Sequence, residues 1–173
     1  SGTRAHTRRE ILTGREPVHV TLKLCQGLPS FRKKEVFRIL RIAVRKSRQK
    51  GLAVTHFAIL SNHIHLIVEP PRGGMRKLFQ SLCISFSKRL NASLDRTGRV
   101  FRDRYHVHVL KTPLEMRNAL AYVLANEGRH IARKLGLGRS AKLIVRIDPF
   151  SSAFAFLKWK KLFRVPPDFE YSG

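Results

Sequence analysis

The spacing of apolar and polar residues predicts alternating strands and helices in the first half of the chain. Residues 18–24 alternate between apolar and polar side chains and start with β-branched residues, which is typical of a strand with one buried face. Residues 31–50 repeat their apolar positions every three to four residues, which predicts an amphipathic helix. Two short apolar runs, 52–60 and 63–68, are separated by a two-residue break, the spacing of a β-hairpin.

The second half of the chain continues the succession of predicted strands and helices. Residues 75–94 predict a long amphipathic helix. The helix that follows has a clear start signal, because Thr112, Pro113 and Glu115 stand where an N-cap, a first helical residue and the acid of a capping box belong. Between these helices, residues 100–110 alternate as a strand would, with apolar side chains on one face and a basic set on the other: Arg102, Arg104, His106 and His108.

This element order predicts the fold class. A β-α-β-β-α-β series followed by a further helix is an α+β fold, with a ferredoxin-like split βαββαβ antiparallel sheet and both crossover helices on one sheet face. The other face is left for a ligand and for the last helix, which carries Tyr122. With 173 residues, one folded domain is expected at 17–134, with a basic N-terminal arm at 1–16 and an aromatic and basic tail at 135–173.

The charge balance points to a polyanion partner. The chain has 35 Lys and Arg against 11 Asp and Glu, a formal net charge of +24, which favours nucleic acid binding. The helix at 31–50 carries cations at four- and three-residue spacing on the side opposite its apolar residues, and these form a candidate track for phosphates. The predicted DNA-binding residues are Lys34, Arg38, Arg41, Arg45, Arg48, Arg102, Arg104 and Arg129.

Other functional classes lack their sequence signals. No apolar run is long enough for a membrane span and no signal peptide is evident, so we expect a cytoplasmic, nucleoid-associated protein without a membrane partner. Acidic residues are too scattered for a carboxylate-clamped pair of metal ions. The sequence also contains no Gly-rich phosphate loop and no nucleophile elbow, which argues against an ATP-driven enzyme and against a serine hydrolase.

Two histidine pairs are candidate metal ligands. His63 and His65 are two residues apart on a predicted strand, so their imidazoles project from the same face and can bind one divalent ion. His106 and His108 have the same spacing. Spacing alone does not distinguish a metal site from the more common alternative, in which the histidines are ordinary surface or DNA-facing side chains.

The helix that starts at Thr112 supplies a candidate nucleophile. Tyr122 and Asn126 are four residues apart and share one face of that helix. The phenol oxygen can act as a nucleophile and the amide oxygen can complete a metal site with two imidazoles. The alternative is a tyrosine at the edge of the apolar stripe whose hydroxyl makes an ordinary surface hydrogen bond.

Several segments resemble a known family. Residues 61–69, SNHIHLIVE, are similar to the histidine-hydrophobic-histidine signature of the HUH single-tyrosine transposases. Residues 101–130, FRDRYHVHVLKTPLEMRNALAYVLANEGRH, resemble REP-associated tyrosine transposases. The resemblance extends to residues 17–30 and 147–159.

The resemblance implies a DNA strand transferase. It implies that His63 and His65 bind Mg²⁺ or Mn²⁺, that Asn126 is the third ligand and that Tyr122 is the catalytic nucleophile. Residues 17–134 would then be the catalytic domain, cleaving and rejoining single-stranded DNA with a hairpin through a 5′-phosphotyrosine. The pattern gives no metal role to His106 and His108. REP-associated relatives suggest a monomer, although a homodimer that exchanges the helix of Tyr122 is an alternative.

Two other functions fit part of the sequence. A non-enzymatic RNA-binding or ribosome-associated module would also combine a ferredoxin-like sheet with high positive charge, but the strands lack an aromatic base-stacking motif. An HUH replication initiator or relaxase would use similar chemistry, and the short chain argues against it.

Overall fold

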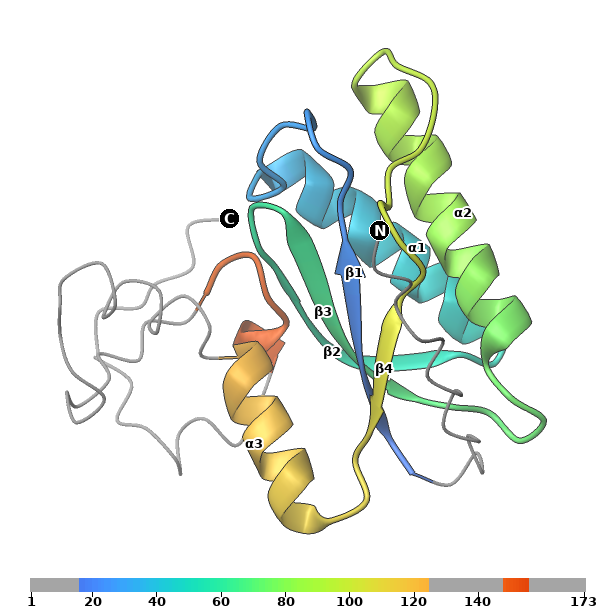
Figure 1. The fold of residues 1–173 in the computed structure, drawn as a ribbon, viewed down its shortest axis with the longest axis vertical. Coiled ribbons are helices and arrows are strands. Elements are labelled where there is room, and N and C mark those ends of the chain that lie inside the picture. Colours follow the sequence, from blue (N-terminus) through green and yellow to red (C-terminus); the bar gives the residue numbers. More distant parts are fainter. Residues whose placement is uncertain (1–15, 125–147, 156–173) are drawn as a thin grey trace, which may run out of the picture.

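A four-stranded antiparallel sheet forms the centre of the fold, as predicted. The computed structural model describes residues 16–124 and 148–155. The strand order β2-β3-β1-β4 is that of a ferredoxin-like sheet (Figure 1). The strands are β1 (Val18–Lys23), β2 (Ala53–Ile59), β3 (His63–Glu69) and β4 (His106–Val109).

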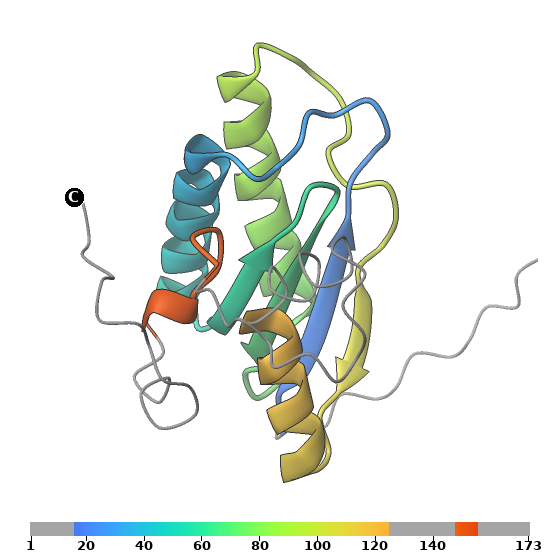
Figure 2. The ribbon, with the colours of Figure 1, turned by 90° about the vertical axis from the view of Figure 1, so that its left-hand side faces the viewer.

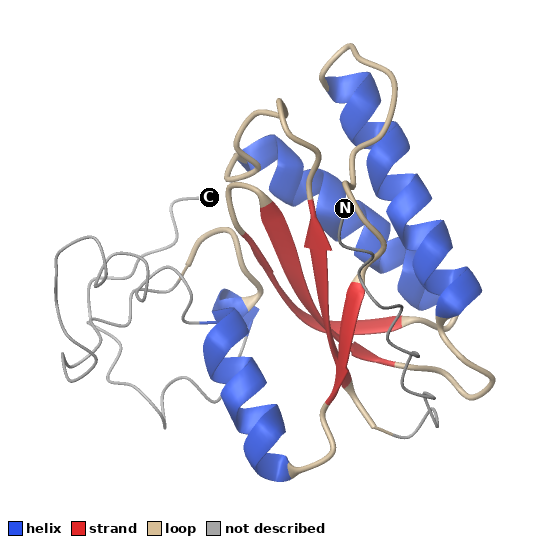
Figure 3. Cartoon of the chain, in the orientation of Figure 1, coloured by secondary structure: helices blue, strands red, loops and turns tan. Residues whose placement is uncertain are grey.

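The α-helices of the described residues are divided between the two faces of this sheet. Helices α1 (Lys34–Gln49) and α2 (Arg76–Ser93) pack against each other on one face. Helix α3 (Pro113–Leu124) lies on the opposite face, where it contacts β2 and β3 (Figures 2 and 3). A short 3-10 helix, η1 (Ala153–Ala155), follows in the last described segment. The α+β class and the split of the helices between the faces are thus confirmed.

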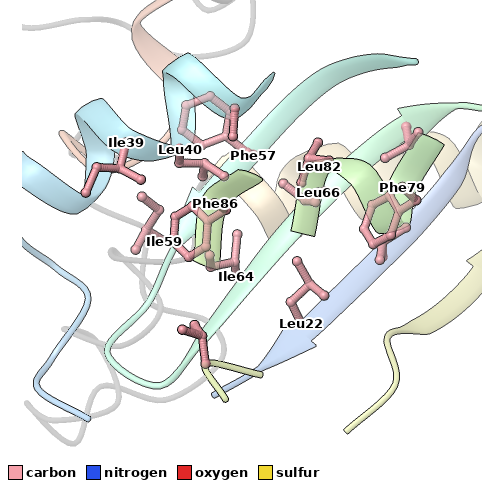
Figure 4. Close-up of a cluster of buried hydrophobic side chains, with 14 of the residues drawn as sticks. Leu22, Ile39, Leu40, Phe57, Ile59, Ile64, Leu66, Phe79, Leu82 and Phe86 are labelled. Atoms are coloured by element: carbon pink, nitrogen blue, oxygen red, sulfur yellow. The ribbon is translucent and has the colours of Figure 1, made fainter. Parts of the chain in front are cut away.

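Strand alternation divides the buried side chains into two clusters. The main core lies between the sheet and α1 and α2, and Figure 4 shows Leu22, Leu66 and Phe86 within it. A smaller cluster on the other face joins Ala58 of β2 and Ile67 of β3 to the apolar side of α3, which contributes Ala119, Val123 and Leu124. The central strand β3 is therefore buried on both faces, and α3 is held by a satellite cluster of its own.

The strand predicted at 100–110 is much shorter in the structure. Only His106–Val109 forms β4, which pairs with β1. Upstream of it, the pairing is reduced to a bridge between Leu24 and Phe101, next to which the amide of Arg102 donates to the carbonyl of Lys23 over 2.9 Å, and residues 103–105 leave the ladder. The side chain of Arg102 forms an ion pair with the neighbouring Asp103, with 2.8 Å between Nε and Oδ2. The prediction that Arg102 and Arg104 share a strand face with the two histidines was therefore wrong.

The capping box at the start of α3 is formed as the sequence predicts. The backbone amide of Glu115 donates to Oγ1 of Thr112 over 3.1 Å. In return, Oε2 of Glu115 accepts from the backbone amides of Thr112 and Lys111 at 3.0 and 2.6 Å. This pairing satisfies amide groups that the first helical turn leaves without helical partners.

Loss of this cap should weaken the helix that carries Tyr122. We expect Thr112→Ala to lower the free energy of unfolding by about 1 kcal/mol, because the amide of Glu115 loses its acceptor. Urea denaturation followed by circular dichroism measures this change. Thr112→Ser is the matched control, since serine keeps the hydroxyl and should restore most of the stability. Equal stability of the two variants would contradict the role given to the cap.

The described part of the predicted tail lies along the outer edge of β2. Ser151 bridges to Ala58, and the amide of Ile59 donates to the carbonyl of Phe150 over 2.8 Å. Arg32 fixes this segment through two hydrogen bonds of 3.0 Å to the carboxylate of Asp148, which is 1% exposed. The two charge-assisted hydrogen bonds offset part of the cost of removing this carboxylate from water. The segment covers an edge strand that would otherwise be open.

Candidate active site under helix α3

The two histidines of the predicted metal pair lie on the sheet face covered by α3. Alternation along β3 buries Ile64 and Leu66 in the main core and turns His63 and His65 to the other side. Their ring centroids are 4.7 Å apart and the rings are nearly perpendicular. His63 is half-buried, whereas His65 is only 4% exposed. The ring of His65 contacts the polar side chains of His19, Thr21 and Tyr122, so it is not buried among hydrocarbon alone.

Tyr122 reaches this pair from helix α3 of the same chain. Packing of Ala119 and Val123 onto β2 and β3 turns Tyr122 toward the sheet at the edge of the cluster. Its ring centroid is 4.9 Å from that of His65, with an angle of 80° between the planes. The side chain is 36% exposed, so solvent or a ligand can reach it. One chain is therefore enough to bring the tyrosine to the histidines.

Strand β1 adds two residues that sequence reasoning missed. Nε2 of His19 lies 3.1 Å from Nδ1 of His65, and Oγ1 of Thr21 lies 3.2 Å from the same atom. The ring of His19 also contacts that of Tyr122, with 5.9 Å between centroids. The alternation of residues 18–24 already placed both side chains on the polar face of the strand. Their proximity to His65 depends on the β1–β3 register, which pairs Thr21 with His65 and which the sequence does not specify.

The environment of His19 favours its neutral form. Burial lowers the pKa of His19 below its ordinary value, and the nearby His108 lowers it further. At neutral pH the imidazole is therefore uncharged and one of its nitrogens can accept a hydrogen bond. His108 stands opposite His19 in the β1–β4 register and is exposed, as is His106.

Hydrogen bonds to Nδ1 make the two β3 histidines suitable ligands. Nδ1 of His63 lies 2.6 Å from the side-chain oxygen of Asn62, which can only accept, so Nδ1 carries the proton and Nε2 the lone pair. Nδ1 of His65 lies within hydrogen-bonding distance of His19 and Thr21, each of which can donate or accept, so these two residues hold the ring of His65 in place without fixing which nitrogen carries the proton. Metal-binding histidines ordinarily have their second nitrogen fixed like this. The pair thus fits two positions of a divalent site.

The third predicted ligand lies beyond what the structure describes. Asn126 and Arg129 both fall outside the described residues. Within residues 16–124 and 148–155, no group of three His, Cys, Asp or Glu side chains is arranged to hold a metal ion. A complete site therefore needs a ligand of another type or one from outside these ranges.

The predicted cationic stripe on α1 is exposed but faces away from Tyr122. All five side chains lie on the solvent side of α1: Lys34, Arg38, Arg41, Arg45 and Arg48. Because α1 and α3 cover opposite faces of the sheet, the stripe and the candidate site are separated by the sheet (Figure 2). A strand of DNA that touches both must pass around a sheet edge. Arg104 is also exposed, on the loop before β4.

Comparison with known proteins gives the fold class. No protein-family model and no curated protein sequence matches this chain. Among solved structures, the chain is similar to that of a REP-associated tyrosine transposase bound to a REP hairpin, with a TM-score of 0.66 and 16% sequence identity. The match covers 98% of this chain and 96% of the other. At this identity the likeness shows a shared fold, an antiparallel sheet with helices on both faces.

No helix within residues 16–124 and 148–155 is both long and apolar enough to cross a lipid bilayer.

Proposed function

We propose that the protein cleaves and rejoins single-stranded DNA by tyrosine transesterification, as a DNA transposase. The observation that carries this proposal is the contact between Tyr122 and His65 beside His63, on an accessible sheet face. The shared fold with a transposase bound to a REP hairpin supports hairpin-bearing DNA as the substrate. The net charge of +24 supports a polyanionic substrate independently of that likeness.

The chemical step exchanges one phosphoester for another. The phenol oxygen of Tyr122 attacks the scissile phosphorus, and its proton passes to solvent. A bond forms between phosphorus and the phenol oxygen while the bond to the 3′ oxygen breaks. The leaving oxygen takes up a proton and becomes a free 3′-OH, so the products are a 5′-phosphotyrosine and a 3′ end. Because the number of phosphoester bonds is conserved, a second 3′-OH can reverse the reaction without ATP.

The residues of β1 and β3 prepare the site for this step. His63 and His65 would hold Mg²⁺ or Mn²⁺, and Asn126 is proposed as the third ligand. When bound, such an ion neutralises charge on the scissile phosphate. His19 and Thr21 fix the ring of His65 in one orientation through its Nδ1. The satellite cluster packs α3 against the sheet and so fixes the position of Tyr122 relative to the histidines.

An adduct assay tests the proposed reaction directly. The full-length protein is incubated with Mn²⁺ and a DNA hairpin carrying single-stranded flanks, and with the same sequence as a duplex. We expect a covalent protein-DNA band on a denaturing gel with the flanked hairpin only. Binding to RNA and DNA with no adduct on any substrate would instead support a passive nucleic-acid-binding module.

The stripe on α1 is proposed to contact phosphates away from the reaction centre. We expect Arg38→Glu combined with Arg41→Glu to weaken DNA binding and to reduce the slope of log affinity against log salt by about 1.4 to 1.8, since two phosphate contacts are lost. Fluorescence anisotropy over a salt series measures both effects.

A second double variant distinguishes the loss of these two contacts from the general effect of a lower net charge on DNA binding. Arg72→Glu with Lys77→Glu reverses two exposed cations that are not part of the stripe and gives the same net charge. If both double variants have the same salt slope, the stripe is an ordinary solvated face.

A further inference from the structure

An open groove lies beside Tyr122, between α3 and the strands β1 and β4. Its volume is about 550 Å³, within the range of about 300–1,000 Å³ that small-molecule sites occupy. Tyr122 is one of its lining residues, so a ligand in the groove lies beside the proposed nucleophile. The groove is also lined by His19, His108, Leu110, Glu115 and Asn118.

The charge of the groove does not suit a phosphate. Although the chain has 35 Lys and Arg residues, none of them is among the described residues that line this groove. Among the described lining residues the carboxylate is that of Glu115, whose pKa is held below its ordinary value by hydrogen bonds from the backbone amides of Thr112 and Lys111. An ionised carboxylate repels the phosphodiester backbone, so the groove suits an uncharged part of a nucleotide.

The remaining lining groups suit a nucleobase. Asn118 is exposed and its amide offers a donor and an acceptor side by side, which match one edge of a base. The exposed ring of His108 provides a flat surface for stacking, and Leu110 provides an apolar contact. Unpaired bases in single-stranded nucleic acid are recognised through such stacking and edge contacts.

The position of Asn118 limits which base can reach it. It precedes Tyr122 by four residues on α3, which is about 6 Å along the helix axis. Successive nucleotides of a stacked strand advance by about 3.4 Å. The base that contacts Asn118 therefore belongs within one or two nucleotides of the phosphate at Tyr122.

We propose that this groove binds one unpaired base of the DNA next to the cleaved phosphate and that Asn118 reads its edge. This inference rests on the proposed strand-transfer function and adds to it a protein contribution to the choice of cleavage site. Adenine is the expected base, because an asparagine amide pairs with the adjacent acceptor and donor of adenine. The carboxylate of Glu115 favours an uncharged base over a second phosphate at the Asn118 side of the groove.

A randomised substrate measures this recognition. DNA hairpins whose single-stranded flanks carry random bases are incubated with the full-length protein and Mn²⁺, and the cleaved strands are sequenced. For the unmodified protein we expect a preference of about 5- to 150-fold for adenine at one position beside the cleavage site. Asn118→Ala should reduce that preference to less than about two-fold, while adducts still form on the pool.

Two further variants make the test specific to Asn118. Asn118→Asp should move the preference toward cytosine, because a carboxylate accepts from the amino group of that base. Gln49→Ala removes an exposed amide from α1 on the other side of the sheet and should leave the preference unchanged. Alanine is a better helix former than asparagine, so unfolding of α3 cannot account for an effect of Asn118→Ala.

The experiment distinguishes a failure of the proposed reaction from a failure of base recognition by the groove. If the unmodified protein forms no adduct with any sequence in the pool, the proposed function fails. If adducts form and Asn118→Ala keeps the same base preference as the unmodified protein, the groove does not read the base and only the present inference is overturned.

Discussion

Tyr122→Phe should abolish the covalent protein-DNA adduct while leaving DNA binding within about two-fold of normal. The substitution removes only the phenol oxygen, and the phenyl ring can keep its contacts with His65 and His19. Loss of an enzyme's nucleophile commonly costs at least about 10³-fold in rate. The adduct band on a denaturing gel and the anisotropy of a labelled hairpin measure the two quantities separately.

Another tyrosine provides the control for this result. Tyr105 packs its ring against Phe79, with 4.5 Å between centroids, on the main-core side of the molecule. Tyr105→Phe should therefore keep the adduct at the normal level. A persistent adduct in Tyr122→Phe would mean that another group attacks phosphorus and would remove Tyr122 from the mechanism.

His63→Ala should lower adduct formation by at least about 100-fold, and EDTA should do the same to the unmodified protein. His63 is half-buried and hydrogen-bonds the side chain of the adjacent Asn62, so the fold should tolerate its loss better than that of the buried His65. Thermal unfolding of the variant checks this point. Activity of the EDTA-treated protein should return on addition of excess Mn²⁺, whereas His63→Ala should stay inactive.

His106→Ala is the matched control for the metal pair. His106 is also the first histidine of a His-x-His pair on a strand, but it is exposed on β4 and pairs in register with Thr21. Its loss should leave the adduct unchanged. Cleavage that is indifferent to both EDTA and His63→Ala would show that the reaction proceeds without a bound ion.

Local sequence signals predicted most of the fold. The period-two alternation of β1 and β3, the helical spacing in α1 and α2 and the Thr112 capping box are determined by residues close together in the chain, and each appears in the structure. The strand at 100–110 was predicted too long because alternation is equally compatible with a short strand preceded by a turn. Whether such a segment joins the ladder depends on its partner strand, β1.

The candidate site was less accessible to sequence reasoning. Alternation placed His63 and His65 on one face, and helical spacing placed Tyr122 beside its apolar stripe. The roles of His19 and Thr21 require the register between β1 and β3, which is set by packing and turn geometry over a long sequence separation. The location of the α1 cations behind the sheet likewise follows from the topology of the crossover helices.

The satellite cluster that holds α3 has a dynamic consequence. Because a few small and aliphatic side chains join this helix to the sheet, its detachment exposes far less apolar surface than opening of the main core. The tyrosine-bearing helix can therefore come away as a local, sub-global event while the four strands stay intact. In the proposed strand-transfer reaction, such a local release would allow a 5′ end attached to Tyr122 to change position and reach a new acceptor before the covalent bond is broken.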